Sequence, residues 1–293
     1  MRMVLTLIAG VRGRQSLAYV ADAIARAVSI IGEPVWLAAD ACDLFFDAAN
    51  PEPDETTARR IIAGAEIDAL VQAAAHRRKH LLVADLESTI IENEMLDELA
   101  EFTGRRQEVA EITRRAMNGE VDFAAALEER VALLAGLPDH ALAGAAHRIR
   151  VNPGARQLVA TMRKAGAVTV LVSSGFMIFA ERVAAQLGFD RVIANRLDLV
   201  AGQIAGTVLR PLVTGETKRQ TLFAVAAEYA IPLHQSIAVG DGANDLPMLA
   251  TAGLGIAFHA KPAVAAVSRW RLDHADLTGL LYAQGYRQDE ILN

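Results

Sequence analysis

The chain has 293 residues, of which 53% are apolar and 22% are charged, a balance typical of a folded protein. Its net charge of −6 argues against nucleic acid as a partner, because a phosphate backbone selects a basic face. The one cysteine, Cys42, excludes an internal disulfide and a thiolate metal cluster. No apolar run approaches the ~18 residues of a membrane span, and the N-terminus is a poor signal peptide, so we expect a cytoplasmic protein without membrane contact.

The first part of the chain reads as a small α/β unit. The segment MVLTLIAG (3–10) predicts a strand, residues 15–28 predict an amphipathic helix, and PVWLAADACDLFF (34–46) predicts one or two further strands. A stretch rich in proline and acid, NPEPDETT (50–57), and a basic patch at 77–80 follow. We predict a separate domain over residues 1–78. It holds no cluster of polar residues suited to chemistry, so we expect a structural or regulatory role.

From residue 79 to 293 the pattern changes to strands that alternate with helices. The predicted strands are short runs rich in Val, Ile and Leu: HLLVAD (80–85), AVTVLVSS (167–174), RVIAN (191–195) and SIAVGDG (236–242). The predicted helices cover 154–165, 176–187, 216–229 and 244–251. This alternation indicates an α/β fold with a doubly wound parallel sheet. Residues 92–150 are helical in pattern throughout and too long for one crossover, so we predict an inserted helical cap there.

Polar residues close these apolar runs. Asp85 and Glu87 follow the first, Ser173 ends the second and Asp241 follows the last. In parallel sheets ligands bind outside the carboxyl ends of the strands, so we expect these four side chains to converge on one site.

The residue types at this edge suit phosphate chemistry on a divalent cation. Asp241 and Asp245 offer the hard oxygen ligands that Mg²⁺ prefers, although GDGAND alone could be a turn with helix-capping side chains. Asp85 can act as a nucleophile, and Glu87 can protonate a leaving alcohol and later deprotonate water. Ser173 and the N–H groups at a helix start can hold phosphate oxygens, and Lys218 can supply a cation.

Together these segments resemble the four motifs of the haloacid dehalogenase superfamily of phosphatases. The motifs are DLEST (85–89), the serine after VTVLV (168–172), the lysine of TGETKRQTL (214–222) and GDGANDLPML (240–249). The cap segments NEMLDELA (93–100) and RRAMNGEVDFAAALEERVALL (114–134) are similar to those of the phosphoserine phosphatase family within it. The likeness covers about residues 80–287. The N-terminal unit is similar in layout to the ACT-like appendage of some members.

This resemblance implies a Mg²⁺-dependent hydrolysis of O-phospho-L-serine, the last step of L-serine biosynthesis, through an aspartyl-phosphate on Asp85. Glu87 would act as acid and base beside it, and Lys218 would complete the catalytic set as the cation that binds the phosphate. Mg²⁺ would be held by Asp85, Asp241 and the Glu87 carbonyl, with Asp245 in support. Two residues are expected to bind the amino-acid end of the substrate, Glu94 its ammonium and Arg130 its carboxylate. The residues expected to surround the remainder of the substrate are Met117, Phe123, Ser173, Ser174, Gly175, Lys218 and Asn244.

The sequence departs from the family pattern at two positions, and these departures leave alternatives open. Glu87 stands where the family usually has Asp, and Ser174 stands where it usually has Gly. A phosphotransferase, a broader phosphomonoesterase and a catalytically slowed phosphoserine sensor remain as alternative functions. Glu94 and Arg130 could also be ordinary solvated helix charges, and Met117 and Phe123 could be cap core. A homodimer is one assembly that the sequence leaves open.

Overall fold

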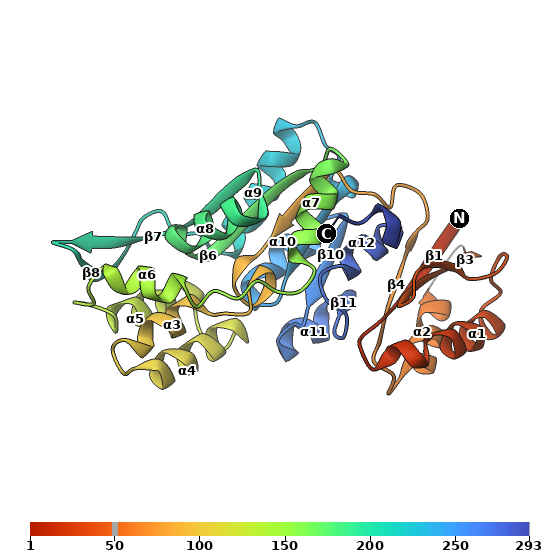
Figure 1. Cartoon of the computed structure of the whole chain (residues 1–293), viewed down its shortest axis with the longest axis horizontal. Helices are drawn as coiled ribbons and strands as arrows, with labels where there is room; N and C mark the ends of the chain where they lie inside the picture. Colours follow the sequence, from red (N-terminus) through yellow and green to blue (C-terminus); the bar gives the residue numbers. More distant parts are fainter. Residues whose placement is uncertain (49–51, 293) are drawn as a thin grey trace.

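The computed structural model describes residues 1–48 and 52–292, except for the side chains of residues 52–54 and 117. The chain forms one four-stranded and one seven-stranded sheet, which follow each other along the sequence (Figure 1). Within the described residues, no helix combines the length and apolar character needed to cross a membrane.

The N-terminal sheet is antiparallel throughout, in the order β2-β3-β1-β4. Two helices pack on one face of it, where their apolar residues and those of the strands form a separate core. The succession βαββαβ is that of a ferredoxin-like unit. Its elements are β1 (Arg2–Ala9), α1 (Leu17–Ala27), β2 (Val35–Ala38), β3 (Ala41–Asp47), α2 (Glu52–Ile62) and β4 (Ile67–Ala73).

The sequence analysis missed α2 and β4. The proline-rich start of α2 reads as a loop, yet proline is tolerated in a first helical turn, where its missing N–H would have no partner. Strand β4 has an apolar pattern interrupted by Asp68 and Gln72, which are both buried. Their side chains bond to the C-terminal part of the chain, so the interruption marks a contact and not a loop.

The second sheet has the order β11-β10-β9-β5-β6-β7-β8, and every neighbouring pair is parallel except β7 with β8. The predicted α/β fold with a parallel, doubly wound sheet is therefore confirmed. Strands β8, β10 and β11 were not predicted. The strands are β5 (Leu81–Ala84), β6 (Val168–Phe176), β7 (Arg191–Val200), β8 (Gln203–Leu209), β9 (Ser236–Gly240), β10 (Leu254–Phe258) and β11 (Trp270–Leu272).

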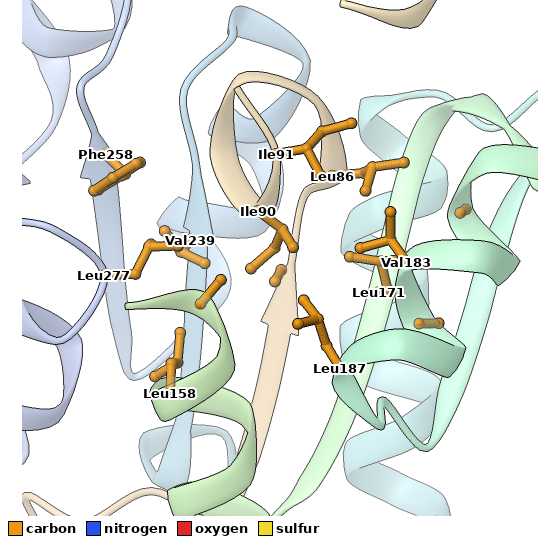
Figure 2. Close-up of a cluster of buried hydrophobic side chains, with 14 of the residues drawn as sticks. Leu86, Ile90, Ile91, Leu158, Leu171, Val183, Leu187, Val239, Phe258 and Leu277 are labelled. Carbon is orange, nitrogen blue, oxygen red and sulfur yellow. The ribbon is translucent and has the colours of Figure 1, made fainter. Parts of the chain in front are cut away.

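Helices cover both faces of this sheet, and successive strand residues alternate between the two cores. Leu82 and Val239 face the core formed with α7 (Ala155–Lys164), α8 (Met177–Leu187) and α12 (Gly279–Ala283). Leu81 and Val83 face the opposite core, formed with α9 (Gly215–Glu228), α10 (Leu246–Thr251) and α11 (Pro262–Val267). Figure 2 shows Leu86, Ile90 and Ile91, just after β5, in the first of these cores with Leu171 and Val239. The residues that follow β5 therefore pack in the same core as Leu82 of the strand itself.

Four helices lie between β5 and α7, in the stretch predicted to be a helical cap: α3 (Met95–Glu101), α4 (Arg106–Met117), α5 (Phe123–Ala132) and α6 (His140–Ala146). The chain enters and leaves this stretch through adjacent segments. Ile91 and Val151 form an isolated bridge, and the Glu92 N–H donates to the Arg150 carbonyl at 2.8 Å. The loop after α5 also pairs with β8, where Ile204 donates to Leu137. The cap is therefore attached to the core through its two paired ends and through the β7–β8 hairpin.

The two sheets are held together by buried polar contacts. The Asp68 carboxylate accepts hydrogen bonds from the backbone N–H groups of Asp273, His274 and Ala275, at 2.8, 3.1 and 2.9 Å. Arg77 lies in the segment that connects the two sheets. Its guanidinium donates to both carboxylate oxygens of Asp43 and to the Ala283 carbonyl. These groups are satisfied only when the N-terminal sheet lies against the C-terminal segments.

We expect Asp68→Ala to lower the free energy of unfolding by about 3 kcal/mol, because buried N–H groups then lose their acceptor. Urea denaturation would measure the loss. Asp22→Ala on the exposed side of α1 is the matched control and should stay within about 0.5 kcal/mol of wild type. An Asp68→Ala protein as stable as this control would show that the contact contributes nothing.

Candidate active site

Asp85 stands at the carboxyl end of β5, where its N–H donates to the Val239 carbonyl of β9 at 3.0 Å. Its carboxylate lies beside a fully buried lysine. Lys218, in the first turn of α9, places Nζ 2.7 Å from Asp85 Oδ1 and 2.6 Å from Asp245 Oδ1. Burial alone would lower the pKa of Lys218, but Asp245 and Asp85 outweigh it and raise that pKa above its usual value. The lysine is therefore a permanent cation between two carboxylates.

The turn after β9 supplies two further acids. Asp245 Oδ2 accepts the N–H groups of Asp241 at 3.2 Å and Gly242 at 3.1 Å, which fixes the turn. Asp241 Oδ1 accepts a hydrogen bond from the Thr89 hydroxyl at 3.2 Å. Oxygen atoms of Asp85, Asp241 and Asp245 all lie within 4.8 Å of one another. Asp85 and Asp241, which the sequence analysis expects at one edge of the sheet, therefore lie close together.

This cluster carries more negative charge than its lysine can balance. Burial, followed by the charge of Asp245, raises the pKa of Asp85 well above its ordinary value. Burial and then Glu94 raise the pKa of Asp241 to about 7. Asp241 Oδ2 accepts no hydrogen bond from any described residue, although Lys261 Nζ lies 3.4 Å away. Buried carboxylate oxygens with a spare acceptor suit a hard divalent cation.

Strand β6 is irregular where it reaches this cluster. Ser173 pairs with Ala194 and Phe176 with Asn195, so Ser174 and Gly175 form a bulge in the ladder. The sequence analysis ended the strand at Ser173–Ser174, whereas it runs to Phe176. The Gly175 N–H donates to Ser173 Oγ at 2.9 Å, and Asn244 Nδ2 donates to Ser174 Oγ at 3.3 Å. Ser174 and Gly175 line the site, whereas Ser173 does not and instead holds the bulge through its hydroxyl.

Glu87 uses its extra methylene to reach the cap. Its Oε1 accepts the Met95 N–H at the start of α3, at 3.0 Å. Its carboxyl also lies directly over Gly175, where an added Cβ would stand only 2.5 Å from Oε2. Burial, followed by the charge of Glu94, raises the pKa of Glu87 to about 8. The carboxyl is therefore held between the core and the cap, and near neutral pH it is mainly protonated.

Cap residues close the opposite side of the site. Glu94 precedes α3, and its Oε1 accepts the Ser88 hydroxyl at 2.6 Å. Arg130 of α5 is almost completely buried, with Nε donating to the Ala126 carbonyl and Nη1 to the Thr113 hydroxyl, both at 3.0 Å. Arg130 is therefore not a solvated helix charge. The predicted contribution of Met117 lies outside the described side chains.

The lining of the resulting cavity comes from both parts of the chain: Asp85, Glu87, Glu94, Leu96, Phe123, Leu127, Arg130, Ser174, Gly175, Asp241 and Asn244. The space at its centre is only about 10 Å³, close to the least that admits one water molecule. The structure is thus closed over the site. Lys218 and Asp245 were predicted here too, and they lie behind Asp85 instead of on the cavity wall.

Two supporting residues were not predicted. Asn195, which ends the RVIAN run, is buried, and its Nδ2 donates to the Ser174 carbonyl while its Oδ1 accepts the Val213 N–H, both at 2.7 Å. Thr89 lies in the DLEST segment and holds Asp241. Asn195 has the signal of a polar side chain at the end of an apolar run, which was applied only to charged residues and serine.

A family model described as haloacid dehalogenase-like hydrolase matches residues 82–250. The chain belongs to this family. The predicted resemblance is therefore confirmed, and the matched range begins within β5 and ends within α10. It contains Asp85, Lys218 and Asp241, and it includes the whole cap.

Curated relatives of this hydrolase carry the name phosphoserine phosphatase. One from Streptococcus thermophilus is 47% identical over 68% of this chain and 93% of its own length. Another from Saccharomyces cerevisiae is 36% identical over 94% of this chain and 91% of its own. One from Mycobacterium tuberculosis is 40% identical over 82% of this chain, but the chain spans only 59% of that relative's length.

Solved structures of other family members have the same fold. A HAD family hydrolase from Salmonella enterica serovar Typhi superposes with a TM-score of 0.85 at 26% identity, covering 96% of this chain and 98% of that one. A structure described as a phospho-aspartyl intermediate analogue of phosphoserine phosphatase has a TM-score of 0.68 at 36% identity. It covers 70% of this chain and 98% of that one. The first of these matches includes the N-terminal unit.

We expect Asn195→Ala to lower the free energy of unfolding by about 2–4 kcal/mol, because the buried Ser174 carbonyl and Val213 N–H both lose their partner. Thermal or urea unfolding would measure this. Asn118→Ala is the control, because among the described residues the Asn118 side chain bonds only to exposed Glu120, and it should change stability by less than about 0.5 kcal/mol. Equal stabilities of the two variants would contradict a supporting role for Asn195.

Proposed function

We propose that this hydrolase is a Mg²⁺-dependent phosphoserine phosphatase that releases L-serine and phosphate from O-phospho-L-serine. The observation that carries the proposal is the division of charge across one closed cavity. Asp85, backed by Lys218, stands on the core side, and Arg130 and Glu94 stand on the cap side. A phosphorylated amino acid has a phosphate at one end and a carboxylate and ammonium at the other, so it complements both sides.

The cap side accounts for recognition of the amino acid. Arg130 would bind the substrate carboxylate, because a guanidinium pairs with a carboxylate through two parallel hydrogen bonds. Glu94 would accept a hydrogen bond from the ammonium, and Phe123 would pack against the Cβ carbon. The names of the curated relatives, and a solved structure described as a substrate-bound phosphoserine phosphatase complex, support this substrate.

The core side would hold the phosphate. Ser174, Gly175 and Asn244 line this wall, and Ser173 orients the bulge through the Gly175 N–H. Hydrogen-bond donors on a strand bulge followed by the start of α8 suit phosphate oxygens. Lys218 would reduce the repulsion between the Asp85 carboxylate and the approaching phosphate, because its cationic Nζ lies against Asp85 Oδ1.

The donors present fit Mg²⁺. Asp85 and Asp241 would bind it with the Glu87 carbonyl, and Asp245 would hold the turn behind them. Asp241 Oδ2, which accepts no hydrogen bond from any described residue, and the three clustered carboxylates both support this assignment. When bound, Mg²⁺ would neutralise charge on the phosphate and on the nucleophile.

Two displacements at phosphorus complete the reaction. In the first, an Asp85 oxygen forms a bond to phosphorus while the bond to the serine oxygen breaks, and protonated Glu87 donates its proton to that oxygen. In the second, Glu87 takes a proton from water, the water oxygen bonds to phosphorus, and the Asp85 carboxylate leaves. The raised pKa of Glu87 is consistent with a carboxyl that starts the cycle protonated.

We expect phosphate release from O-phospho-L-serine to require Mg²⁺, to stop with EDTA and to fall at least about a thousandfold in Asp85→Asn, which removes the nucleophile. Glu87→Asp should not gain activity and should lose up to about 10²-fold, because the shorter side chain withdraws the carboxyl by about a bond length. O-Phosphoethanolamine, which has no carboxylate to pair with Arg130, is the control substrate and should react poorly.

Other outcomes would favour the alternatives. If the wild-type protein binds phosphoserine without turnover and the Glu87→Asp variant gains activity, the chain is a phosphoserine sensor. Phosphoryl transfer to added homoserine at the expense of free phosphate would make it a phosphotransferase. Equal rates on O-phosphoethanolamine would contradict recognition through Arg130 and indicate a broader phosphomonoesterase.

We expect Gly175→Ala to lower kcat about 10²-fold, because the new Cβ would stand 2.5 Å from Glu87 Oε2 and displace the carboxyl. Adding Glu87→Asp to Gly175→Ala should recover part of this loss, because a shorter acid leaves room for the methyl group. Steady-state kinetics of both single variants and the double variant would measure the coupling. Strictly multiplicative losses would show that Gly175 and Glu87 act independently.

A further inference from the structure

A second cavity, of about 990 Å³, lies between the N-terminal sheet and the seven-stranded sheet. We call it the interface cleft and define it by Met3, Arg59, Lys79, His234, Arg269 and Trp270. Met3 and Arg59 come from β1 and α2, and the other four from the second part of the chain. In Figure 1 the N-terminal unit lies beside β11, which begins with Trp270. Small-molecule sites are often clefts of this size at domain interfaces.

The cleft lies at the opposite edge of the parallel sheet from the candidate active site. Lys79 and His234 precede the amino ends of β5 and β9, and Trp270 opens β11. Asp85 and Asp241 follow the carboxyl ends of β5 and β9. The strands themselves separate the two sets of residues, so the cleft is not an extension of the catalytic cavity.

The cleft contains a buried cation that pairs with no carboxylate among the described side chains. Lys79 is 7% exposed, and its Nζ donates to the carbonyls of His76 at 3.1 Å and His234 at 2.9 Å. No described carboxylate lies within ion-pair distance of it. Among the described residues, two neutral acceptors use two of its three N–H donors and leave the third unpaired. Burial, followed by Arg77, lowers the pKa of Lys79 to about 8, so at pH 7 the charge persists.

Two arginines add to this charge at the mouth of the cleft. Arg59 lies 2.9 Å and Arg269 3.7 Å from the shared carboxylate of Glu55, which balances only one of them. With Lys79, the described charged groups that line the cleft carry an excess of positive charge on a chain whose net charge is −6. The Arg269 guanidinium lies over the Trp270 ring, 4.7 Å from its centroid, and Met3 adds apolar surface.

We propose that the interface cleft binds a small organic anion, with its carboxylate or phosphoryl head at Lys79 and its apolar body along Trp270 and Met3. The described residues give the buried Lys79 ammonium only carbonyl acceptors. An anion would accept its remaining N–H and balance its charge. Residues from both sheets line the cleft, so an occupant would also join the N-terminal unit to the catalytic part. The proposal does not rest on the reaction proposed above.

Trp270 offers a direct reporter of occupancy. The chain has two tryptophans, and Trp36 is 45% exposed on β2, so Trp36→Phe leaves Trp270 as the only indole. In this background we would titrate phenylphosphonate and 3-phenylpropionate at pH 7 and follow the fluorescence. Benzyl alcohol is the uncharged control. We expect saturable changes with one or both anions and none with benzyl alcohol at equal concentration.

Variants then assign the signal to the cleft. Lys79→Gln and the exposed Arg269→Gln should each weaken binding about tenfold, as expected for the loss of a charge-assisted hydrogen bond. Lys79→Arg, which keeps the charge, should weaken it less than Lys79→Gln. Asp85→Asn should leave the titration unchanged, which separates the cleft from the catalytic cavity.

The proposal is overturned if neither anion changes Trp270 fluorescence, or if benzyl alcohol binds as well as the anions. It is also overturned if Asp85→Asn abolishes the signal, or if Arg269→Gln, in a protein that melts like wild type, binds with unchanged affinity. A Lys79→Gln chain that fails to fold leaves Lys79→Arg and Arg269→Gln to decide the outcome. If phenylphosphonate alone binds, the head group is a phosphoryl group; if 3-phenylpropionate alone binds, it is a carboxylate.

Discussion

The site depends on one buried ammonium. Lys218 is inaccessible to solvent and bridges Asp85 and Asp245, so it joins the end of β5 to the turn after β9 through α9. Asp245 in turn fixes that turn through the N–H groups of Asp241 and Gly242. A neutral residue in place of Lys218 would leave several buried carboxylates without compensation, a costly arrangement in a dry interior. The same contact therefore organises the fold locally and sets the charge of the site.

The parallel sheet and the positions of its acids could be predicted because both follow from strong local signals. Runs such as LLVA are buried on both faces, and such runs in a parallel sheet end at a common edge. That rule alone brings Asp85 and Asp241 together. It does not place Lys218, which lies in α9, and the resemblance to known phosphatases was needed to select this lysine among others.

The missed features depend on contacts between distant segments. Asp68 and Gln72 interrupt the apolar pattern of β4 because their partners lie more than 200 residues away, at 273–275 and 283. The bulge at Ser174 and Gly175 depends on Asn195 and on the packing of Glu87, which no local pattern encodes. Sequence reasoning treated Glu87 as an Asp moved by one methylene. The structure shows that this methylene carries the carboxyl to the start of α3.

The contact between Glu87 and the Met95 N–H joins the acid to the helical cap. Both stems of the cap emerge side by side at Ile91 and Val151, a geometry that suits rotation of the helices as one body. An outward rotation would carry Met95 away and release the carboxyl that the closed form holds in place. The acid would then be aligned only while the cap encloses the substrate. In the reaction proposed above, such an arrangement would time proton transfer to closure and would shield a phosphorylated Asp85 from stray nucleophiles between substrate binding and product release.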